Sequence, residues 1–575
     1  MGNSTARVAA TQQSASQTDD VVKDALGGQH FTPGTFSIDE YKPLKVVVIG
    51  AGFSGIIAGI SGLSCDIPSH CYQLTFEEKT DWSSFYAPGH EILAYLQSVV
   101  DKYKLMRYIK LQHELVHAQY DEPSGKWHLR IRRPAAQEGQ FEEFEDTADF
   151  FVTAVGALSN WEWPDVQGLK DFKGQLFHSA AFEVGDKTWQ EAVKDWKDKK
   201  VGVIGVGSSA IQIVPALQPR VAKVCNYVRG KTWLAVPFAS PKFLEMMGRD
   251  PSSENYAFTD KDKQLFEKDP AFYKHFRHEL EADINSLHPS TLRGSDQQAV
   301  ARALFKANML KKLAKKPWIA DYLMPDFPVA CRRLTPGPGY LEALCEDNVE
   351  FIPTHIKRIT SDGIETVDGK HEDLDVIICA TGFITSFQLP FPIIGRNGVD
   401  IREKWRPHPT SYLSICVDGF PNMFMTFGPN SGVGSGSLLV LLEAEIGYAV
   451  KAAQKMQRER LKSIEIKMEA VRDYDEYLES YFPKTIYTEK CRSWYKMGKE
   501  EGRIVALWPG SCLHGTRALA NPRWEDYNYE LLDGAKNRMY WLGDGQTYNE
   551  KTMTGDRAWY LNDEEVDAPP VPVAN

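Results

Sequence analysis

The chain has 575 residues, 43% hydrophobic and 25% charged, as in ordinary soluble globular proteins. Its net charge of −11 argues against nucleic acid or an anionic membrane surface as the main partner. Since it lacks an apolar run of roughly 18 residues and a signal-peptide core, we expect a cytoplasmic protein without a membrane-spanning segment. Nine scattered cysteines, an odd number, indicate reduced thiols rather than a disulfide framework.

A first glycine-rich motif follows a polar stretch at residues 1–40, which we expect to be a mobile arm, and a β-branched strand predicted at 45–49. The motif reads Gly50-Ala-Gly52-Phe-Ser-Gly55 and precedes a helix-like stretch. Such glycines let the backbone turn tightly and approach a pyrophosphate at a helix N-terminus. We therefore expect these three glycines to bind a dinucleotide.

Further strands and helices follow along the chain. Residues 115–120 and 127–131 predict a hairpin, and 148–155 predict a buried strand. The charged, aromatic-rich stretch 240–330 predicts an inserted helical lobe, and 437–458 predict one long helix.

A second motif, Gly205-Val-Gly207-Ser208-Ser209, follows another β-branched strand that begins at residue 201. We expect the two glycines and the two serines of this motif to bind a second dinucleotide. Since few reaction types need two nucleotides side by side, the two motifs predict a flavin enzyme that takes hydride from a nicotinamide.

The group that recognises the ribose in such folds stands about 20 residues beyond the glycines, as an acid for NAD or a cation for NADP. After a strand predicted at 222–228, the chain offers Arg229 and Lys231 there and no carboxylate. The sequence therefore favours NADPH. The alternative interpretation of these two cations is a solvated basic turn.

Several longer motifs match a known family. They are Phe172-x-Gly174-x3-His178-x3-Phe182, Cys331-Arg332-Arg333, Ala380-Thr381-Gly382-Phe383, and the stretches at 161–168, 427–431 and 491–495. With them, residues 44–560 resemble the class B flavoprotein monooxygenases, which include flavin-containing and Baeyer–Villiger monooxygenases. The three stretches are similar to fungal enzymes of natural-product (secondary metabolite) pathways.

The resemblance implies an α/β fold with two Rossmann-like dinucleotide-binding domains, one for FAD and one for NADP. The expected segments are the arm 1–40, the first part of the FAD domain at 41–165, the NADP domain at 166–380 with its helical insertion at 240–330, and the second part of the FAD domain with the C-terminal region at 381–575. No metal is expected.

The resemblance also implies a mechanism. NADPH reduces FAD, dioxygen adds at the flavin C4a, and the peroxide inserts oxygen beside the carbonyl of a hydrophobic, polycyclic ketone. Arg333 would supply the fixed cation that an anionic peroxide requires, and Asp66, in Cys65-Asp66-Ile-Pro68, would pair with it. Without the resemblance, Arg333 reads as a surface cation in a Pro/Gly loop.

Cofactor contacts are implied for five further residues. Arg332 belongs to the basic pair that faces the nicotinamide and flavin, and Thr381 and Gly382 belong to the returning strand of the flavin domain. His178 lies in the linker between the domains, where a conformational rather than an acid–base role is implied. Trp494 would line the pocket or contact cofactor. For Asn430, outside this set, a turn cap and a contact with the flavin edge stay open.

Two departures from the family leave alternatives open. Phe182 stands where the Baeyer–Villiger branch has tryptophan, so hydroxylation or N- or S-oxygenation by the same peroxide is the alternative reaction. A pyridine nucleotide–disulfide reductase would also hold two nucleotides, but Cys65 and Cys71 lack the spacing of its redox pair.

The larger departure is a gap after Gly55. A helix, a second strand ending in Glu and a Gly-Gly-x-Trp loop, on the order of 30 residues, are missing before Cys65. Residues 70–76 could replace that strand, with Glu77 or Glu78 as the ribose acid, but they match family segments that lie beyond the gap. The sequence therefore predicts a truncated first unit with impaired FAD binding, and a non-oxygenating, FAD-deficient variant is an alternative function.

Overall fold

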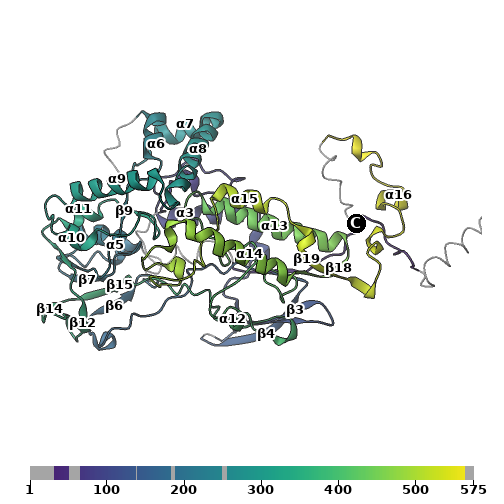
Figure 1. Ribbon diagram of the computed structural model, residues 1–575, viewed down its shortest axis with the longest axis horizontal. Helices are drawn as coiled ribbons and strands as arrows, with labels where there is room; N and C mark the ends of the chain where they lie inside the picture. The colour runs from purple at the N-terminus through teal and green to yellow at the C-terminus, as the bar shows by residue number, and fades with distance from the viewer. Residues whose placement is uncertain (1–30, 51–64, 138, 183–187, 249–254, 564–575) are drawn as a thin grey trace, which may run out of the picture. The chain divides into compact units, whose positions relative to one another are not determined.

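The computed structural model describes residues 31–50, 65–137, 139–182, 188–248 and 255–563 (Figure 1). Gly52, Gly55 and most of the predicted N-terminal arm lie outside the described residues. The chain forms two compact units. One comprises Met1–Pro43, Gln454–Ser463 and Tyr529–Asn575, and the other comprises Leu44–Ala453 and Ile464–Asn528.

The larger nucleotide sheet has five parallel strands in the order β11-β8-β7-β15-β6. These strands are β6 (Gln175–His178), β7 (Lys200–Ile204), β8 (Lys223–Tyr227), β11 (Val349–Ile352) and β15 (Val376–Cys379). Their β-branched residues are buried on both faces, as a parallel sheet covered on both sides requires. The strands predicted at 201 and 222–228 are confirmed.

The two faces of this sheet are covered by different elements (Figure 1). Helices pack on one face, and Val201, Val203, Phe305 and Met309 belong to the hydrophobic core on that side. These helices are α5 (Ala210–Leu217), α9 (Asp296–Lys312), α10 (Ile319–Leu323) and α11 (Tyr340–Leu344). A three-stranded antiparallel sheet covers the other face. Its strands are β12 (Ile356–Ile359), β13 (Gly363–Thr366) and β14 (His371–Asp373).

The smaller nucleotide sheet has three parallel strands in the order β1-β5-β17. They are β1 (Val46–Ile49), β5 (Phe150–Thr153) and β17 (Met423–Met425). Within the described residues β1 is an edge strand, and Val46 and Val48 are 46% and 53% exposed. Apolar side chains on a parallel strand are typical of a face that another element of a nucleotide fold covers.

The predicted hairpin is confirmed and gains two neighbours in a sheet of order β16-β2-β3-β4. The strands are β2 (Glu114–Asp121), β3 (Lys126–Pro134), β4 (Phe141–Ala148) and β16 (Ile393–Ile394). Trp127 of β3 is fully buried against Phe151 of β5, which joins this sheet to the smaller nucleotide sheet.

The described parts of residues 240–330 are mainly helical, as predicted, but their helices pack into two different cores. The first three helices, α6 (Ser240–Met247), α7 (Asp260–Lys268) and α8 (Pro270–Asn285), pack on the segment that contains Cys65 and α3 (Gly89–Lys102). Helices α9 and α10 instead belong to the core of the larger nucleotide sheet. Helical periodicity reveals which face of a helix is apolar, but it does not reveal which neighbour covers that face.

The predicted long helix is α13 (Leu438–Arg458). The remaining elements of four or more residues after β17 and before residue 563 are α14 (Met468–Tyr481), α15 (Cys512–Leu519), α16 (Tyr548–Thr552), β18 (Leu461–Ile466) and β19 (Tyr527–Leu531). The described part of the chain contains no helix that combines the length and apolar character needed to cross a membrane.

The expectation of nine free thiols is wrong. Cys331 and Cys491 form a disulfide across 160 residues, while the other seven cysteines are free and buried. The sequence does not reveal this pairing, because only the packing of two distant segments brings the sulfur atoms together.

Candidate active site

The first glycine of each motif adopts the same backbone geometry. Gly50 has φ +109° and Gly205 has φ +130°. A Cβ atom would lie 2.2 Å from the carbonyl oxygen of Ala154 at Gly50, and 2.4 Å from that of Ala380 at Gly205. Both positions therefore demand glycine, because the turn has left-handed backbone and touches the neighbouring strand.

The second motif lies at the N-terminus of α5, where a ligand could come close to the backbone. Gly207 has open space where a side chain would stand, and Ser209 is the N-cap without a side-chain capping bond. The hydroxyl groups of Ser208 and Thr335 lie 2.6 Å apart. This arrangement leaves amide groups at a helix N-terminus, which is suited to a pyrophosphate.

A buried asparagine that we did not single out from the sequence fixes this turn. Asn226, at the end of β8, donates from Nδ2 to the carbonyl oxygens of Val203 (3.1 Å) and Gly205 (3.0 Å). Its Oδ1 accepts from the hydroxyl of Tyr340 at 2.7 Å. Its place just before the predicted basic turn was the available sequence signal.

The basic residues gather beyond this turn. Arg332 Nη1 donates to the carbonyl oxygen of Lys231 at 2.9 Å, so its guanidinium lies at the 229–231 turn. Lys231 contacts Asp326 at 3.3 Å, but that carboxylate is 95% exposed. Among the described residues no carboxylate pairs with Arg229 or Arg332. Cations without acidic partners fit an anionic ligand.

Arg333 and Asp66 form the ion pair that the resemblance implies. Nε and Nη2 of Arg333 lie 2.8 and 2.6 Å from Oδ2 of Asp66, and each side chain is 30% exposed. Burial alone would lower the pKa of Arg333, but the carboxylate of Asp66 outweighs it and the pKa is raised. The guanidinium therefore stays charged at any working pH and is held in one orientation.

Buried and half-buried aromatic side chains lie near this ion pair. Burial raises the pKa of Tyr495 to about 12, while the positive charge of Arg333 opposes the shift. Trp494 is half-buried and its ring lies edge-on to that of Tyr495, with centroids 4.8 Å apart. Burial also raises the pKa of Tyr72. The ion pair thus lies in a largely apolar setting, which strengthens its field.

His178 links two of the family motifs. It ends β6, its ring stacks on Trp161 at 4.2 Å, and its Nε2 lies 3.3 Å from the hydroxyl of Thr381. Burial lowers the pKa of His178, so the neutral imidazole prevails at neutral pH. Gly382 directly follows Thr381. It has φ +94°, and no atom lies within 4 Å of the position that a Cβ atom would occupy.

Two residues hold the segment 427–431. Asn430 donates to the carbonyl oxygens of Ile504 and Leu507 at 3.0 and 3.1 Å, which makes it a structural anchor. Glu445, missed in the sequence, is fully buried and accepts from the amide of Phe427 at 2.8 Å. Burial raises its pKa to about 8. The sequence signal that could have revealed Glu445 is an acidic residue within the apolar run of α13.

Few described residues could bind the adenosine part of FAD. Described residues 65–113 contain α3, short 3-10 turns and isolated bridges, but no strand to pair with β1. Residues 70–76 are not a strand, Glu77 is bonded to Lys102 and Glu78 to Arg277. The replacement strand is therefore excluded. Within described residues 65–113, no strand ends in an acidic residue that could bind a ribose.

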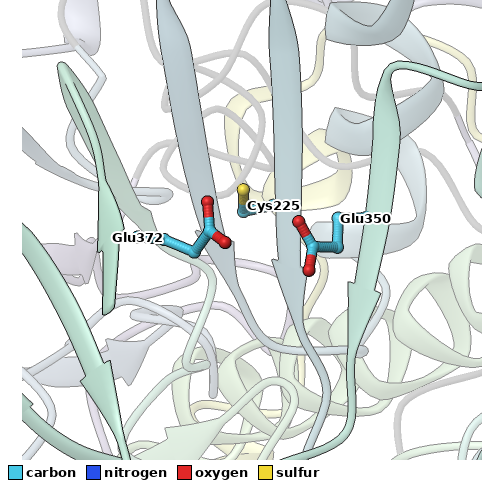
Figure 2. A group of neighbouring side chains, drawn as sticks. All are labelled: Cys225, Glu350 and Glu372. Carbon is cyan, nitrogen blue, oxygen red and sulfur yellow. The ribbon is translucent and has the colours of Figure 1, made fainter. Parts of the chain in front are cut away.

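One side-chain cluster could be mistaken for a metal site. Cys225, Glu350 and Glu372 place their ligand atoms within 4.8 Å of one another (Figure 2). However, Nζ of Lys223 lies 2.6 Å from Glu350 and 2.9 Å from Glu372. The ammonium group already supplies the cation that these carboxylates require.

Comparisons with known proteins identify the family of this chain. Residues 60–240 match the model of the flavin-binding monooxygenase-like family. The FAD-binding monooxygenase tazF of Aspergillus terreus is 34% identical over 553 residues, covering 90% of this chain and 95% of tazF. A Baeyer-Villiger monooxygenase of Pseudomonas aeruginosa is 30% identical over 497 residues, covering 81% of this chain and 88% of that protein.

Solved structures show the same fold. Cyclohexanone monooxygenase of Rhodococcus sp. Phi1, bound to NADP+, superposes with a TM-score of 0.70 at 24% identity, covering 85% of this chain and 99% of that one. An oxidized steroid monooxygenase bound to NADP gives 0.68 at 25% identity, covering 84% and 93%. The chain therefore belongs to the class B flavoprotein monooxygenases and is a flavin-dependent monooxygenase with two Rossmann-type domains.

Proposed function

We propose that the protein uses FAD, NADPH and dioxygen to insert an oxygen atom beside the carbonyl of a hydrophobic ketone, a Baeyer–Villiger oxidation. The observation that carries this proposal is the ion pair of Arg333 with Asp66, a permanent cation held by a carboxylate near the buried Tyr495. The relatives named FAD-binding and Baeyer-Villiger monooxygenases support it.

Bound FAD, once reduced, supplies the activation of dioxygen. In this proposal Arg333 binds the negative charge that develops near the carbonyl, and Asp66 keeps the guanidinium aligned. Tyr495 and Trp494 keep water away from the reacting carbonyl. Gly205, Gly207, Ser208 and Ser209 would hold the NADPH pyrophosphate.

Product analysis tests the reaction type. We expect the purified protein, given NADPH, FAD and isotopically labelled dioxygen, to convert a panel of cyclic and polycyclic ketones to lactones carrying one labelled oxygen atom. Alcohol or S-oxide products from a matched panel would favour the alternative reaction, for which Phe182, packed on Phe177 and Trp196, is the sequence clue.

The choice of NADPH is tested by Arg229→Ala combined with Lys231→Ala. We expect the KM for NADPH to rise about tenfold or more, because two cations that face a 2′-phosphate are lost, while the KM for NADH changes little. Steady-state oxidation of each cofactor measures both values. An equal rise for the two cofactors would contradict the assignment.

A second candidate function rests on β1, which pairs with β5 alone among the described residues and whose Val46 and Val48 side chains are exposed. In it the protein binds NADP(H) but holds FAD weakly and does not oxygenate. The visible absorption spectrum after gel filtration separates the candidates. We expect a retained flavin spectrum if the first proposal holds, and a colourless protein that stays colourless with added FAD if the second holds.

A further inference from the structure

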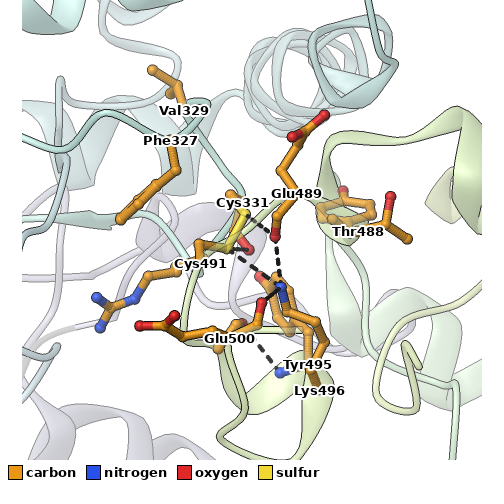
Figure 3. The surroundings of a disulfide bond; sticks show 12 residues. Phe327, Val329, Cys331, Thr488, Glu489, Cys491, Tyr495, Lys496 and Glu500 are labelled. Carbon is orange, nitrogen blue, oxygen red and sulfur yellow. Dashed lines mark hydrogen bonds between the residues drawn. A yellow bond between two sulfur atoms is a disulfide. The ribbon is translucent and has the colours of Figure 1, made fainter. Parts of the chain in front are cut away.

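The disulfide joins the catalytic arginine segment to a second basic segment. Cys331 directly precedes Arg332, which is followed by Arg333, and Cys491 directly precedes Arg492. The Cα atoms of the two cysteines lie 6.5 Å apart, and both residues are buried (Figure 3). Two arginines distant in sequence thus follow the two ends of one covalent link.

Both arginines hold their positions through backbone carbonyl groups. Arg332 donates to the carbonyl oxygen of Lys231 at 2.9 Å, and Nε of Arg492 donates to that of Gly498 at 2.9 Å. Burial and, secondarily, the positive charge of Arg492 lower the pKa of Arg332. In the described part of the chain neither guanidinium has a carboxylate partner. Two guanidinium groups that follow the two ends of one disulfide and have no acidic partner suit a multiply charged anion.

We propose that Arg492 is a further cation of the site that binds the cofactor 2′-phosphate, and that the Cys331–Cys491 disulfide holds it beside Arg332. This inference rests on the proposed use of NADPH. A phosphate offers three acceptor oxygen atoms, so guanidinium groups from two segments can bind it at once.

The buried Lys496 stabilises the loop that carries Arg492. Nζ of Lys496 donates to the carbonyl oxygens of Glu489 at 2.7 Å and Glu500 at 2.6 Å, and it lies 3.8 Å from Sγ of Cys491 (Figure 3). The loop that carries Arg492 is therefore ordered by its own contacts, and the disulfide connects this loop to the irregular segment that carries Arg332.

The first test replaces the proposed cation. In the full-length protein, Arg492→Gln should raise the dissociation constant of NADPH about tenfold, because one charge-assisted contact is lost, and should leave that of NADH within about twofold. Arg472→Gln, at an arginine that is 64% exposed, is the matched control. Equal affinities of wild type and Arg492→Gln for NADPH would overturn the assignment.

The second test opens the disulfide. Dithiothreitol reduces the bond by two electrons, each cysteine sulfur gains a hydrogen and the reagent becomes a cyclic disulfide. Denatured protein should show seven thiols before reduction and nine after it. We expect reduction, or Cys331→Ser combined with Cys491→Ser, to weaken NADPH binding several-fold and NADH binding little. Cys512→Ser is the control at a free buried cysteine.

These measurements distinguish failure of the proposed disulfide role from failure of the NADPH assignment. Nine thiols in the untreated protein, or NADPH affinity that is equal in both redox states, would overturn the role of the disulfide. An equal loss for NADPH and NADH would show a purely structural link and would overturn it as well. If the untreated protein binds NADPH and NADH alike, the cofactor assignment itself has failed, while the thiol count still reports the disulfide.

Discussion

Arg333→Ala should abolish ester formation, with a loss of about 100-fold or more in turnover, while NADPH still reduces the flavin. The guanidinium is the fixed cation of the site, whereas hydride transfer requires only that the cofactors are bound side by side. Rapid-mixing absorbance measurements follow flavin reduction, and product chromatography follows the ester.

Two further variants make this result specific. Asp66→Asn keeps the guanidinium but removes its charged partner, so we expect a smaller loss than for Arg333→Ala. Arg358→Ala removes an exposed arginine of β12 that pairs with Glu365, and its activity should match wild type. Normal ester yield from Arg333→Ala would refute its assignment as the catalytic cation.

His70 should make the helical region α6–α8 sensitive to acid. Its ring is fully buried, its Nδ1 lies 2.9 Å from the hydroxyl of Tyr273, and burial, aided by the charges of Arg277 and Lys79, lowers its pKa from 6.5 to about 3. Above pH 6.5 both folded and unfolded states hold neutral histidine, so stability is complete there. As pH falls below 6.5 only the unfolded state gains the proton, and stability declines down to about pH 3.

The size of this effect follows from the shift. Between about pH 7.5 and about pH 5, the proton taken up by the unfolded state should cost the region about 2 kcal/mol. Hydrogen exchange of α8 amides at both pH values, corrected for intrinsic rates, measures the opening free energy. His70→Gln should lose this component, whereas His278→Gln, at a side chain that is 77% exposed, should keep it. Identical pH dependence in wild type and His70→Gln would contradict the prediction.

Much of the fold was predictable because its signals are local. The β-branched runs before Gly50 and Gly205 specify strands buried in parallel sheets, and the same glycines specify turns that no other residue can make. The alternation around residues 115–131 predicted β2 and β3, and the apolar periodicity of 437–458 predicted α13. Each of these features depends on neighbours a few residues away.

Part of the site was also readable from residue types. The family motifs indicated Arg333 and Asp66, and the structure brings these two residues into contact across 267 positions. The position of Arg332 at the 229–231 turn agrees with the predicted basic site. Motifs carry this information because a cation that must face a cofactor has a fixed place on the fold.

Tertiary structure alone decided the rest, since those features depend on segments that meet only after folding. Packing paired Cys331 with Cys491 against our expectation of free thiols, and it divided the 240–330 helices between two cores. It also turned Asn226 into the anchor of a glycine turn. The sequence by itself determined which backbone shapes and charges are available, while long-range burial determined which of them meet, because the free energy of burial depends on the partner as well as on the pattern.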